Sequence, residues 1–377
     1  MPTLPSSTLT DGVVRRDDTL ADGRRLYYYD DAGSTLPTER ARDARTLDPR
    51  PETATMRRDP LTDEWISIAA ARQNRVFLPP ADLDPLAPAS PTNPSEVPDR
   101  YDVAVFENRS PSFGPATAED VDLAHGGAAD GGAADGAVGH TRTSVGRCEV
   151  VCFSPEHEGS LGSQSPARLR TVVEAWADRT AALSQVPGIE QVFPFENRGE
   201  AIGVTLHHPH GQIYGYPYVT PRTQRLVAQV ERHGSGLFEE ILAFESASER
   251  LVVRGEHWSA FVPFAARWPL ELHVMPHRHV ADLAETDTAE RGELAALLPR
   301  LLQGIDALYG DPTPYIAAWH QAPVHSHRDI RLTLQITSPR RAAARLKYLA
   351  GSESAMGAFI GDVLPEAQAA AWKEAVR

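Results

Sequence analysis

The sequence predicts an α+β fold in which one unit of secondary structure occurs twice, giving an antiparallel sheet with helices packed on one face. Three observations predict this fold. An apolar run that ends in proline occurs at 148–155 and again at 270–276. A long amphipathic stretch follows each run, and a pair of aromatic and polar strand-like segments follows each stretch. The two copies are offset by roughly 120 residues, which indicates an internal duplication.

The first copy begins with a strand at 148–155. Ser165 suits the N-cap of a helix, and Pro166 suits the first helical position. Apolar side chains at helical spacing extend this helix to Leu183. Strands at 192–197 and 204–214 complete the copy.

The second copy has the same order of elements. A strand at 270–276 precedes a helix from about 288 to 309, in which leucine and isoleucine side chains recur at helical spacing. Strands at 315–320 and 331–337 complete it. We therefore predict three parts: a polar N-terminal extension at 1–50, a first half at 51–220 and a second half at 221–377.

The segments outside the two copies are less regular. Residues 25–29 form a short strand candidate, and Asp59-Pro60 predicts a turn that leads into a strand ending near residue 69. The proline-rich stretch at 79–99 predicts an irregular loop. Residues 124–139 consist mainly of Gly, Ala and Asp, which is typical of a surface insertion without chemistry.

Composition and charge exclude several classes of protein. The chain has 377 residues and a formal net charge of −14, which argues against nucleic acid as a partner. Any anionic substrate must then be met by a local cluster of arginine or lysine. Cys148 and Cys152 are the only cysteines, and no long apolar run or signal-like start is present. We therefore expect a cytoplasmic protein that is neither secreted nor inserted in a membrane.

The segment at 206–214, LHHPHGQIY, is the most informative part of the chain. In an extended backbone His208 and His210 point to one face, whereas His207 points to the other. A neutral imidazole next to a polarising amide suits nucleophilic attack on phosphorus, which makes His210 and Gln212 candidate catalytic residues. Thr333 and Gln335 replace the two histidines in the second copy, so we assign the reaction to the first half.

Several motifs occur in an order that resembles a known family. HHPHGQIY, FSPEH, FENRG, PLTDEWISI followed by Arg, and WHQAP together look like galactose-1-phosphate uridylyltransferase, of the histidine-triad superfamily. The resemblance runs from about Arg57 to the C-terminus, except for the Gly/Ala insertion. Residues 347–366 are similar to the C-terminal segment of bacterial members. The resemblance as a whole implies a duplicated histidine-triad-like fold.

The resemblance also implies a reaction and a set of site residues. His210 would accept UMP from UDP-glucose and pass it to galactose 1-phosphate in a ping-pong reaction, while His208 would orient or stabilise. Backbone carbonyls would hold a proton on the ring nitrogen of His210 that does not attack. Gln212 can donate to a phosphoryl oxygen but cannot act as an acid, which favours transfer over hydrolysis.

Further residues match substrate-binding positions of the family. Arg72 and Arg75 would bind phosphates as bidentate donors. The resemblance implies a homodimer in which Lys347 and Glu353 come from the second subunit. The remaining matches are Asn197 and Thr205 at the substrate phosphates, Lys347, Tyr348 and Glu353 at the sugar phosphate, and Glu107 and Asn108 near the uridine ribose.

The metal sites of the family are altered here. Members often hold zinc with a Cys-x-x-Cys in the proline-rich loop, but this chain reads Asp84-Pro85-Leu86-Ala87 at that place. Asp84, His157 and His208 remain as candidate ligands, and they would bind zinc less securely than two thiolates and two imidazoles. The second, iron-type site would keep only His320. We expect at most one metal ion per subunit and no organic cofactor.

Two alternatives to uridylyl transfer stay open. A relative that transfers AMP, such as an ADP-sugar or dinucleoside-tetraphosphate phosphorylase, would keep the same histidine and glutamine pattern. A non-catalytic histidine-triad module that binds nucleotides would keep the fold. In both cases the ligand is a small molecule.

Overall fold

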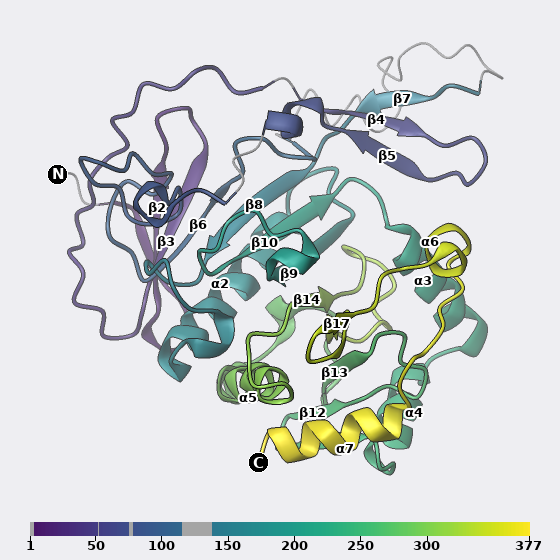
Figure 1. The fold of residues 1–377 in the computed structure, drawn as a ribbon. Helices are drawn as coiled ribbons and strands as arrows, with labels where there is room; N and C mark the ends of the chain where they lie inside the picture. Colours follow the sequence, from purple (N-terminus) through teal and green to yellow (C-terminus); the bar gives the residue numbers. More distant parts are fainter. Residues whose placement is uncertain (1–3, 52, 75–77, 115–137) are drawn as a thin grey trace.

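The computed structural model describes residues 4–51, 53–74, 78–114 and 138–377 (Figure 1). The predictions made for Arg75 and for most of the insertion at 124–139 lie outside these ranges. The strands are β1 Ser6–Thr8, β2 Val14–Thr19, β3 Arg25–Asp30, β4 Thr55–Arg58, β5 Trp65–Ile68, β6 Val103–Glu107, β7 Thr141–Thr143, β8 Arg147–Cys152, β9 Gln191–Arg198, β10 His210–Tyr216, β11 Leu251–Arg254, β12 Trp258–Phe261, β13 Leu270–Pro276, β14 Tyr315–His320, β15 Thr333–Ser338, β16 Arg340–Ala342 and β17 Arg345–Leu346. The α-helices are α2 Pro166–Leu183, α3 Pro221–His233, α4 Leu237–Ser246, α5 Thr288–Ala307, α6 Gly351–Met356 and α7 Pro365–Ala375.

One antiparallel sheet contains twelve of these strands, in the order β1-β2-β3-β6-β8-β10-β9-β14-β15-β13-β12-β11. The order confirms the predicted duplication. Outward from the central pair β9 and β14, the first half continues with β10 and β8, and the second half continues with β15 and β13. Strands β5, β4 and β7 form a separate small sheet at one end of the molecule (Figure 1).

The two predicted long helices are present, and the first begins where its capping residues indicated. The Ser165 side chain accepts a hydrogen bond from the Arg168 N–H at the start of α2, and Asp287 does the same for the Glu290 N–H at the start of α5. Helices α2 and α5 pack against each other and against one face of the sheet, where Trp176 lies beside the indole ring of Trp319. Helix α7 joins the same core.

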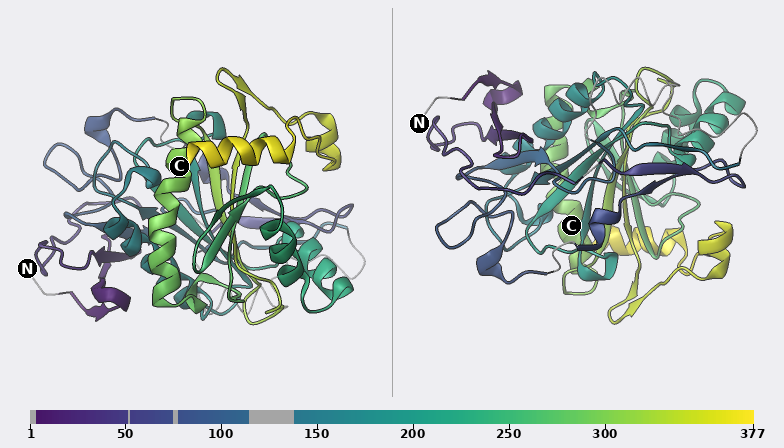
Figure 2. Two further views of the ribbon diagram at one scale, coloured as in Figure 1. Left: turned by 90° about the horizontal axis from the view of Figure 1, so that it is seen from below. Right: turned by 90° about the horizontal axis from the view of Figure 1, so that it is seen from above.

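Helices α3 and α4 occupy the opposite face, so the expectation that all helices lie on one face is wrong. Along β12 and β13, Ala260 and Val274 belong to the core under α5, whereas Phe261 and Met275 pack with Phe238 of α4. Successive strand residues point to opposite faces, and both faces are apolar here. This half of the sheet therefore needs cover on both sides (Figure 2).

The N-terminal segment contributes strands to the main sheet. The predicted strand at 25–29 corresponds to β3, which pairs with β6. Strand β2 was not predicted because its sequence, VRRDDT, is polar. Its two arginines are paired in the fold, as the Arg16 guanidinium lies 2.7 Å from the Asp30 carboxylate and the Arg15 guanidinium lies 2.9 Å from that of Asp178. Whether 1–50 is a separate part stays a prediction.

The strand that carries the histidine motif begins later than expected. A continuous strand was predicted for 204–214, but regular structure starts only at His210. Pro209 has no N–H to donate to a ladder, and Gly203 adopts a left-handed conformation at a φ of 82°. Residues 204–209 therefore form an irregular approach to the strand. No helix in the described ranges is both long and apolar enough to cross a membrane.

Candidate functional site

A cavity of about 660 Å³ opens on the sheet face that carries His210. Its wall combines apolar side chains such as Leu86, Phe106 and Val150 with polar ones from several segments. The structure brings together here six of the residues that the sequence singled out: Arg72, Asn108, Asn197, Thr205, His210 and Gln212.

His210 is the first residue of β10 and lies half-buried opposite Cys152 of β8. Its Nδ1 lies 2.7 Å from the backbone carbonyl oxygen of His208, so Nδ1 carries the hydrogen and donates it. Nε2 then keeps its lone pair, as the sequence predicted. Burial lowers the pKa of His210 from its ordinary value, although the bond to the carbonyl opposes this shift. The ring is therefore neutral at pH 7.

Gln212 lies two residues further along β10, on the same face as His210. Its side-chain oxygen is buried and has no hydrogen-bond partner among the described residues. An unpaired amide inside a polar cavity indicates a position for a ligand. Gly211 between the two is required by close packing, because a Cβ there would come within 2.8 Å of the Phe195 carbonyl oxygen and 2.7 Å of the Phe153 ring.

Among the described residues, three arginines line the same cavity, and Arg24 is bound by the carboxylates of Asp22 and Glu96. Arg72 lies on the short 3-10 helix Ala70–Asn74 that follows β5, and its guanidinium group lies 3.4 Å from the Ser110 carbonyl oxygen. Arg109 follows β6, and its guanidinium group lies 3.3 Å from the Asp48 carbonyl oxygen. Within the described part of the chain, neither Arg72 nor Arg109 has a carboxylate at ion-pair distance. In a protein of net charge −14, these two positive charges indicate a site for an anion.

Arg109 was not predicted as a site residue, although the sequence contains a signal for it. The string Phe-Glu-Asn-Arg occurs at 106–109 and again at 195–198, each time at the end of a strand. The asparagine of each string, Asn108 or Asn197, lines the cavity. The two arginines differ, because Arg198 is bound by the Asp306 carboxylate at 2.8 Å whereas Arg109 stays available.

Four of the residues assigned to substrate binding do not line this cavity. The Glu107 carboxylate is engaged by the guanidinium groups of Arg50 and Arg147. The Lys347 ammonium group lies 2.7 Å from the Glu353 carboxylate, and both side chains are buried in the C-terminal segment. Tyr348 is 78% exposed on the surface. Their part in substrate binding by this chain stays a prediction.

The three candidate metal ligands form a cluster beside the cavity. Asp84, His157 and His208 bring their ligand atoms within 4.8 Å of one another, the one such group found among the described residues. Burial would raise the pKa of Asp84, but hydrogen bonds from His208, the Leu86 N–H and His157 more than offset this and hold it well below its ordinary value. Asp84 and His208 are each only 1% exposed.

The equivalent region of the second half has different chemistry. Gln335 accepts a hydrogen bond of 2.7 Å from the guanidinium group of Arg222, and Thr333 pairs across the sheet with His320. Burial lowers the pKa of His320 well below its ordinary value. In the second half, the two strand positions that correspond to His208 and His210 therefore hold Thr333 and Gln335, and the Gln335 amide is bound by Arg222.

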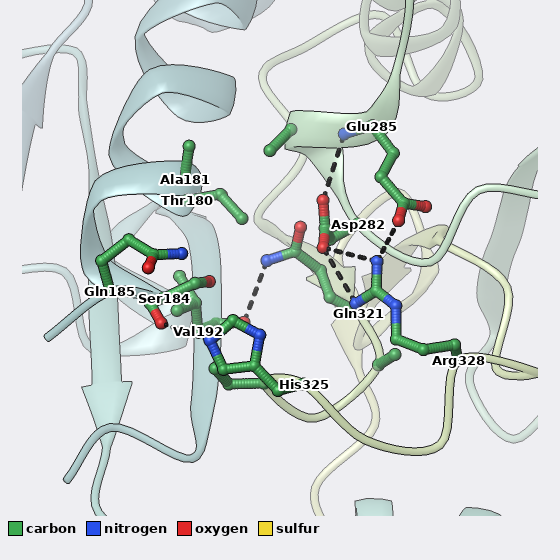
Figure 3. A pocket seen from close by; sticks show the side chains of 13 residues that line it. Thr180, Ala181, Ser184, Gln185, Val192, Asp282, Glu285, Gln321, His325 and Arg328 are labelled. Carbon is green, nitrogen blue, oxygen red and sulfur yellow. Dashed lines mark hydrogen bonds and ion pairs between the residues drawn. The ribbon is translucent and has the colours of Figure 1, made fainter. Parts of the chain in front are cut away.

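A second cavity, of about 520 Å³, lies between the end of α2 and the loop at 321–328 (Figure 3). Its one arginine, Arg328, is bound by the carboxylates of Asp282 and Glu285 (Figure 3). His325 also faces this cavity and bonds the Ser184 carbonyl oxygen at 3.1 Å. Because its positive charge is already neutralised, this cavity suits an anion less well than the one at His210.

Two family models match the chain. The model described as galactose-1-phosphate uridyl transferase, N-terminal domain, matches residues 45–220, and the model for the C-terminal domain matches residues 223–338. The galactose-1-phosphate uridylyltransferase of Streptomyces lividans is 45% identical over 312 residues, which is 81% of this chain and 79% of the relative. That of Thermotoga maritima is 33% identical over 326 residues, which is 85% of this chain and 98% of the relative.

Solved structures give a similar result. A uridylyltransferase structure superposes with a TM-score of 0.73 at 30% identity, over 85% of this chain and 98% of that chain. An ADP-glucose phosphorylase from Arabidopsis thaliana, solved with bound ADP-glucose, superposes with a TM-score of 0.62 at 22% identity, over 85% and 98%. At that identity, the second likeness concerns the fold alone.

Proposed function

Because the chain belongs to the galactose-1-phosphate uridylyltransferase family, we propose that it exchanges UMP between UDP-glucose and galactose 1-phosphate through a uridylyl-His210 intermediate. The observation that carries the proposal is the cavity itself. One wall holds a neutral imidazole with a free Nε2, and the same cavity holds the guanidinium groups of Arg72 and Arg109, which no carboxylate of the described residues neutralises. A nucleophile next to unneutralised positive charge suits attack on a phosphorus atom.

The first half-reaction follows from these groups. The Nε2 lone pair of His210 attacks the α-phosphorus of UDP-glucose, a P–N bond forms, and the P–O bond to the β-phosphate breaks. Glucose 1-phosphate leaves with the bonding electrons, and Arg72 and Arg109 stabilise its negative charge. The Nδ1–H group continues to donate its hydrogen bond to the His208 carbonyl oxygen. This bond stabilises the positive charge that develops on the ring.

The second half-reaction reverses these changes. A phosphate oxygen of galactose 1-phosphate attacks the same phosphorus, the P–N bond breaks, and UDP-galactose leaves with His210 neutral again. Gln212 donates an amide hydrogen to the phosphoryl oxygen but has no acidic proton to give to a leaving group. Water is therefore not activated, and the intermediate survives until the second sugar phosphate binds.

We also propose a homodimer in the cytoplasm. Lys347 and Glu353 lie outside the cavity of their own chain, which supports their delivery to the cavity of a partner subunit. The chain has two cysteines, Cys148 and Cys152, and both are buried on β8, so the fold has no framework of disulfides, which supports a reducing compartment.

The proposal is tested by isotope exchange. With UDP-glucose and labelled glucose 1-phosphate alone, label should enter UDP-glucose, because the first half-reaction needs no galactose 1-phosphate. No exchange until galactose 1-phosphate is added would contradict the ping-pong route. A parallel incubation with ADP-glucose distinguishes the AMP-transferring alternative, and no exchange with either nucleotide sugar would leave only a binding module.

A further inference from the structure

The cluster of Asp84, His157 and His208 stands where the family resemblance implies a zinc ion, but its geometry is that of hydrogen bonds. The Asp84 Oδ2 lies 2.7 Å from the His208 Nδ1 and 2.8 Å from the His157 Nδ1. Two ligands of a tetrahedral zinc ion, each about 2.0 Å from the metal, stand about 3.3 Å apart. Distances of 2.7–2.8 Å belong instead to a charge-assisted N–H···O bond.

Both ring nitrogens of His208 are occupied by contacts with protein oxygen atoms. Its Nε2 lies 2.8 Å from the Ser154 carbonyl oxygen and 3.1 Å from the Tyr101 hydroxyl, which itself lies 2.7 Å from the Leu86 carbonyl oxygen. Its Nδ1 lies 2.7 Å from the Asp84 carboxylate, which can only accept, so Nδ1 donates its hydrogen there and does not face a metal with a lone pair. The described residues add no thiolate or fourth ligand to the group.

We propose that Asp84 and His208 form a buried, hydrogen-bonded carboxylate–imidazole pair that takes the place of the metal ion and positions the catalytic strand. The pair fixes the His208 main chain, and the His208 carbonyl oxygen accepts the Nδ1 hydrogen of His210 at 2.7 Å. Asp84 is thus a positioning residue that sets which nitrogen of His210 is free. This last step rests on the proposed function, whereas the absence of a metal requirement does not.

The metal question is tested without an activity assay. Protein purified without chelator should contain no stoichiometric zinc, and its unfolding temperature should not change with added zinc or with EDTA. One tightly bound zinc per chain, or a rise in the unfolding temperature with zinc, would overturn the proposal. Asp84→Cys combined with Ala87→Cys restores the thiolate spacing of the family and is the matched variant in which zinc should raise the unfolding temperature.

The positioning role is tested with Asp84→Asn, which keeps the shape of the side chain and removes its charge. In folded variant protein, kcat should fall by about ten- to hundredfold, the usual effect of losing an outer hydrogen-bond partner, while KM for UDP-glucose stays near that of the unmodified protein. A rise in KM as large as the fall in kcat, or an unchanged kcat, would contradict the positioning role of Asp84. Zinc content and unfolding still decide the metal-free pair if no variant shows transferase activity.

Discussion

The orientation of one ring, that of His210, connects the sequence motif to the chemistry. The residue is half-buried, its Nδ1 hydrogen is taken by the His208 carbonyl oxygen, and its Nε2 is left to the cavity. Of the charges around it, those of Arg72 and Arg109 are not neutralised by described carboxylates. At the residue scale, the proposed function depends on a neutral nucleophile and on positive charge that is available to bind a phosphate.

Replacement of His210 by glycine should abolish transfer from UDP-glucose and leave a hole where the ring was. A preformed uridylyl imidazolide can fill this hole and donate UMP to galactose 1-phosphate, because the intermediate is then supplied from outside. The rate of UDP-galactose formation from each donor measures this. Turnover of intact UDP-glucose by His210→Gly would refute the assignment of the nucleophile.

Gln212→His should raise the ratio of UDP-glucose hydrolysis to transfer. An imidazole at this position can give a proton to the leaving group and so helps water to compete, which an amide cannot do. Separate assays of free UMP and UDP-galactose give the ratio. If it is the same as in the unmodified protein, the account of why an amide stands there fails.

Arg109→Ala should lower kcat/KM for UDP-glucose by about ten- to hundredfold, the effect of losing a hydrogen bond to a charged group. The matched control is Arg328→Ala, which removes a guanidinium group that Asp282 and Glu285 already neutralise in the other cavity. That variant should keep kcat/KM. Equal losses in the two variants would mean that the charge of Arg109 has no special role.

The sequence identified the reactive residues more easily than the charges that surround them. The alternation of His208, His210 and Gln212 could be read directly, because their types and spacing limit the chemistry. The repeated Phe-Glu-Asn-Arg string marks Arg109 and Arg198 alike, and only the fold shows that Arg109 has no carboxylate partner among the described residues. The role of Arg109 depends on which residues distant in the sequence lie next to it, and motif spacing carries no information on that.

At the scale of elements, β9 connects the cavity to the core on its other face. Asn197 points to the cavity, while Glu196 is 3% exposed and accepts a hydrogen bond of 2.8 Å from the Tyr315 hydroxyl. Burial raises the pKa of Glu196 from 4.5 to about 7, although Tyr315 and Arg198 oppose the shift. The native state therefore holds a proton on Glu196 more tightly than the unfolded chain does.

The contribution of this proton to stability should depend on pH. It is complete below the unfolded pKa of 4.5 and is lost as the pH rises through about 7. The loss is on the order of 3 kcal/mol for a shift of this size. Glu196→Gln keeps a neutral side chain at every pH. The difference in unfolding free energy between this variant and the unmodified protein should therefore shift in favour of the variant as the pH rises from 4.5 to 8. Denaturant unfolding of both proteins across this range measures it, and parallel curves would contradict the assignment.

Regular elements could be predicted where local signals are strong. Helix α2 begins at Pro166 after Ser165, as the capping residues indicated, and α5 begins at Thr288, as the spacing of its apolar side chains indicated. Helices α3 and α4 were not predicted, because they lie between the two copies and are not part of the repeated unit from which the fold was inferred. The start of β10 was misplaced because the apolar and aromatic pattern continues through Pro209, while the backbone hydrogen bonds do not.

For the whole molecule, the prediction to be tested is that the C-terminal segment of one subunit completes the site of another. Lys347 and Glu353 pair with each other in their own chain and lie outside its cavity. A second copy of the chain can bring them to the cavity only if the assembly is a closed dimer with two equivalent sites. The sequence could not establish this, since composition and motifs are identical for one chain and for two.

Mixing two inactive variants tests the dimer. Chains with His210→Gly and chains with Lys347→Ala should each be inactive alone. If Lys347 acts in the partner subunit, every mixed dimer has one intact site, and random reassembly restores about a quarter of the activity. No recovery in mixtures that contain mixed dimers would place Lys347 in its own site or outside the reaction.

The fold of the whole chain was predicted correctly in outline, because the two copies are long enough for their shared order of elements to be recognised. The strand order β8-β10-β9 followed by β14-β15-β13 is the duplicated unit seen from its centre. The polar strand β2 could not be predicted in this way, because its arginine and aspartate side chains form no apolar pattern and its ion pair between Arg16 and Asp30 joins residues of two strands.

Mass spectrometry of the intact protein after incubation with UDP-glucose alone tests the central claim most directly. The account predicts one added UMP per chain, located on His210 by peptide fragmentation, removed by galactose 1-phosphate and absent in His210→Gly. A protein that makes UDP-galactose at a normal rate without ever showing this adduct, or that carries UMP on another residue, would contradict it.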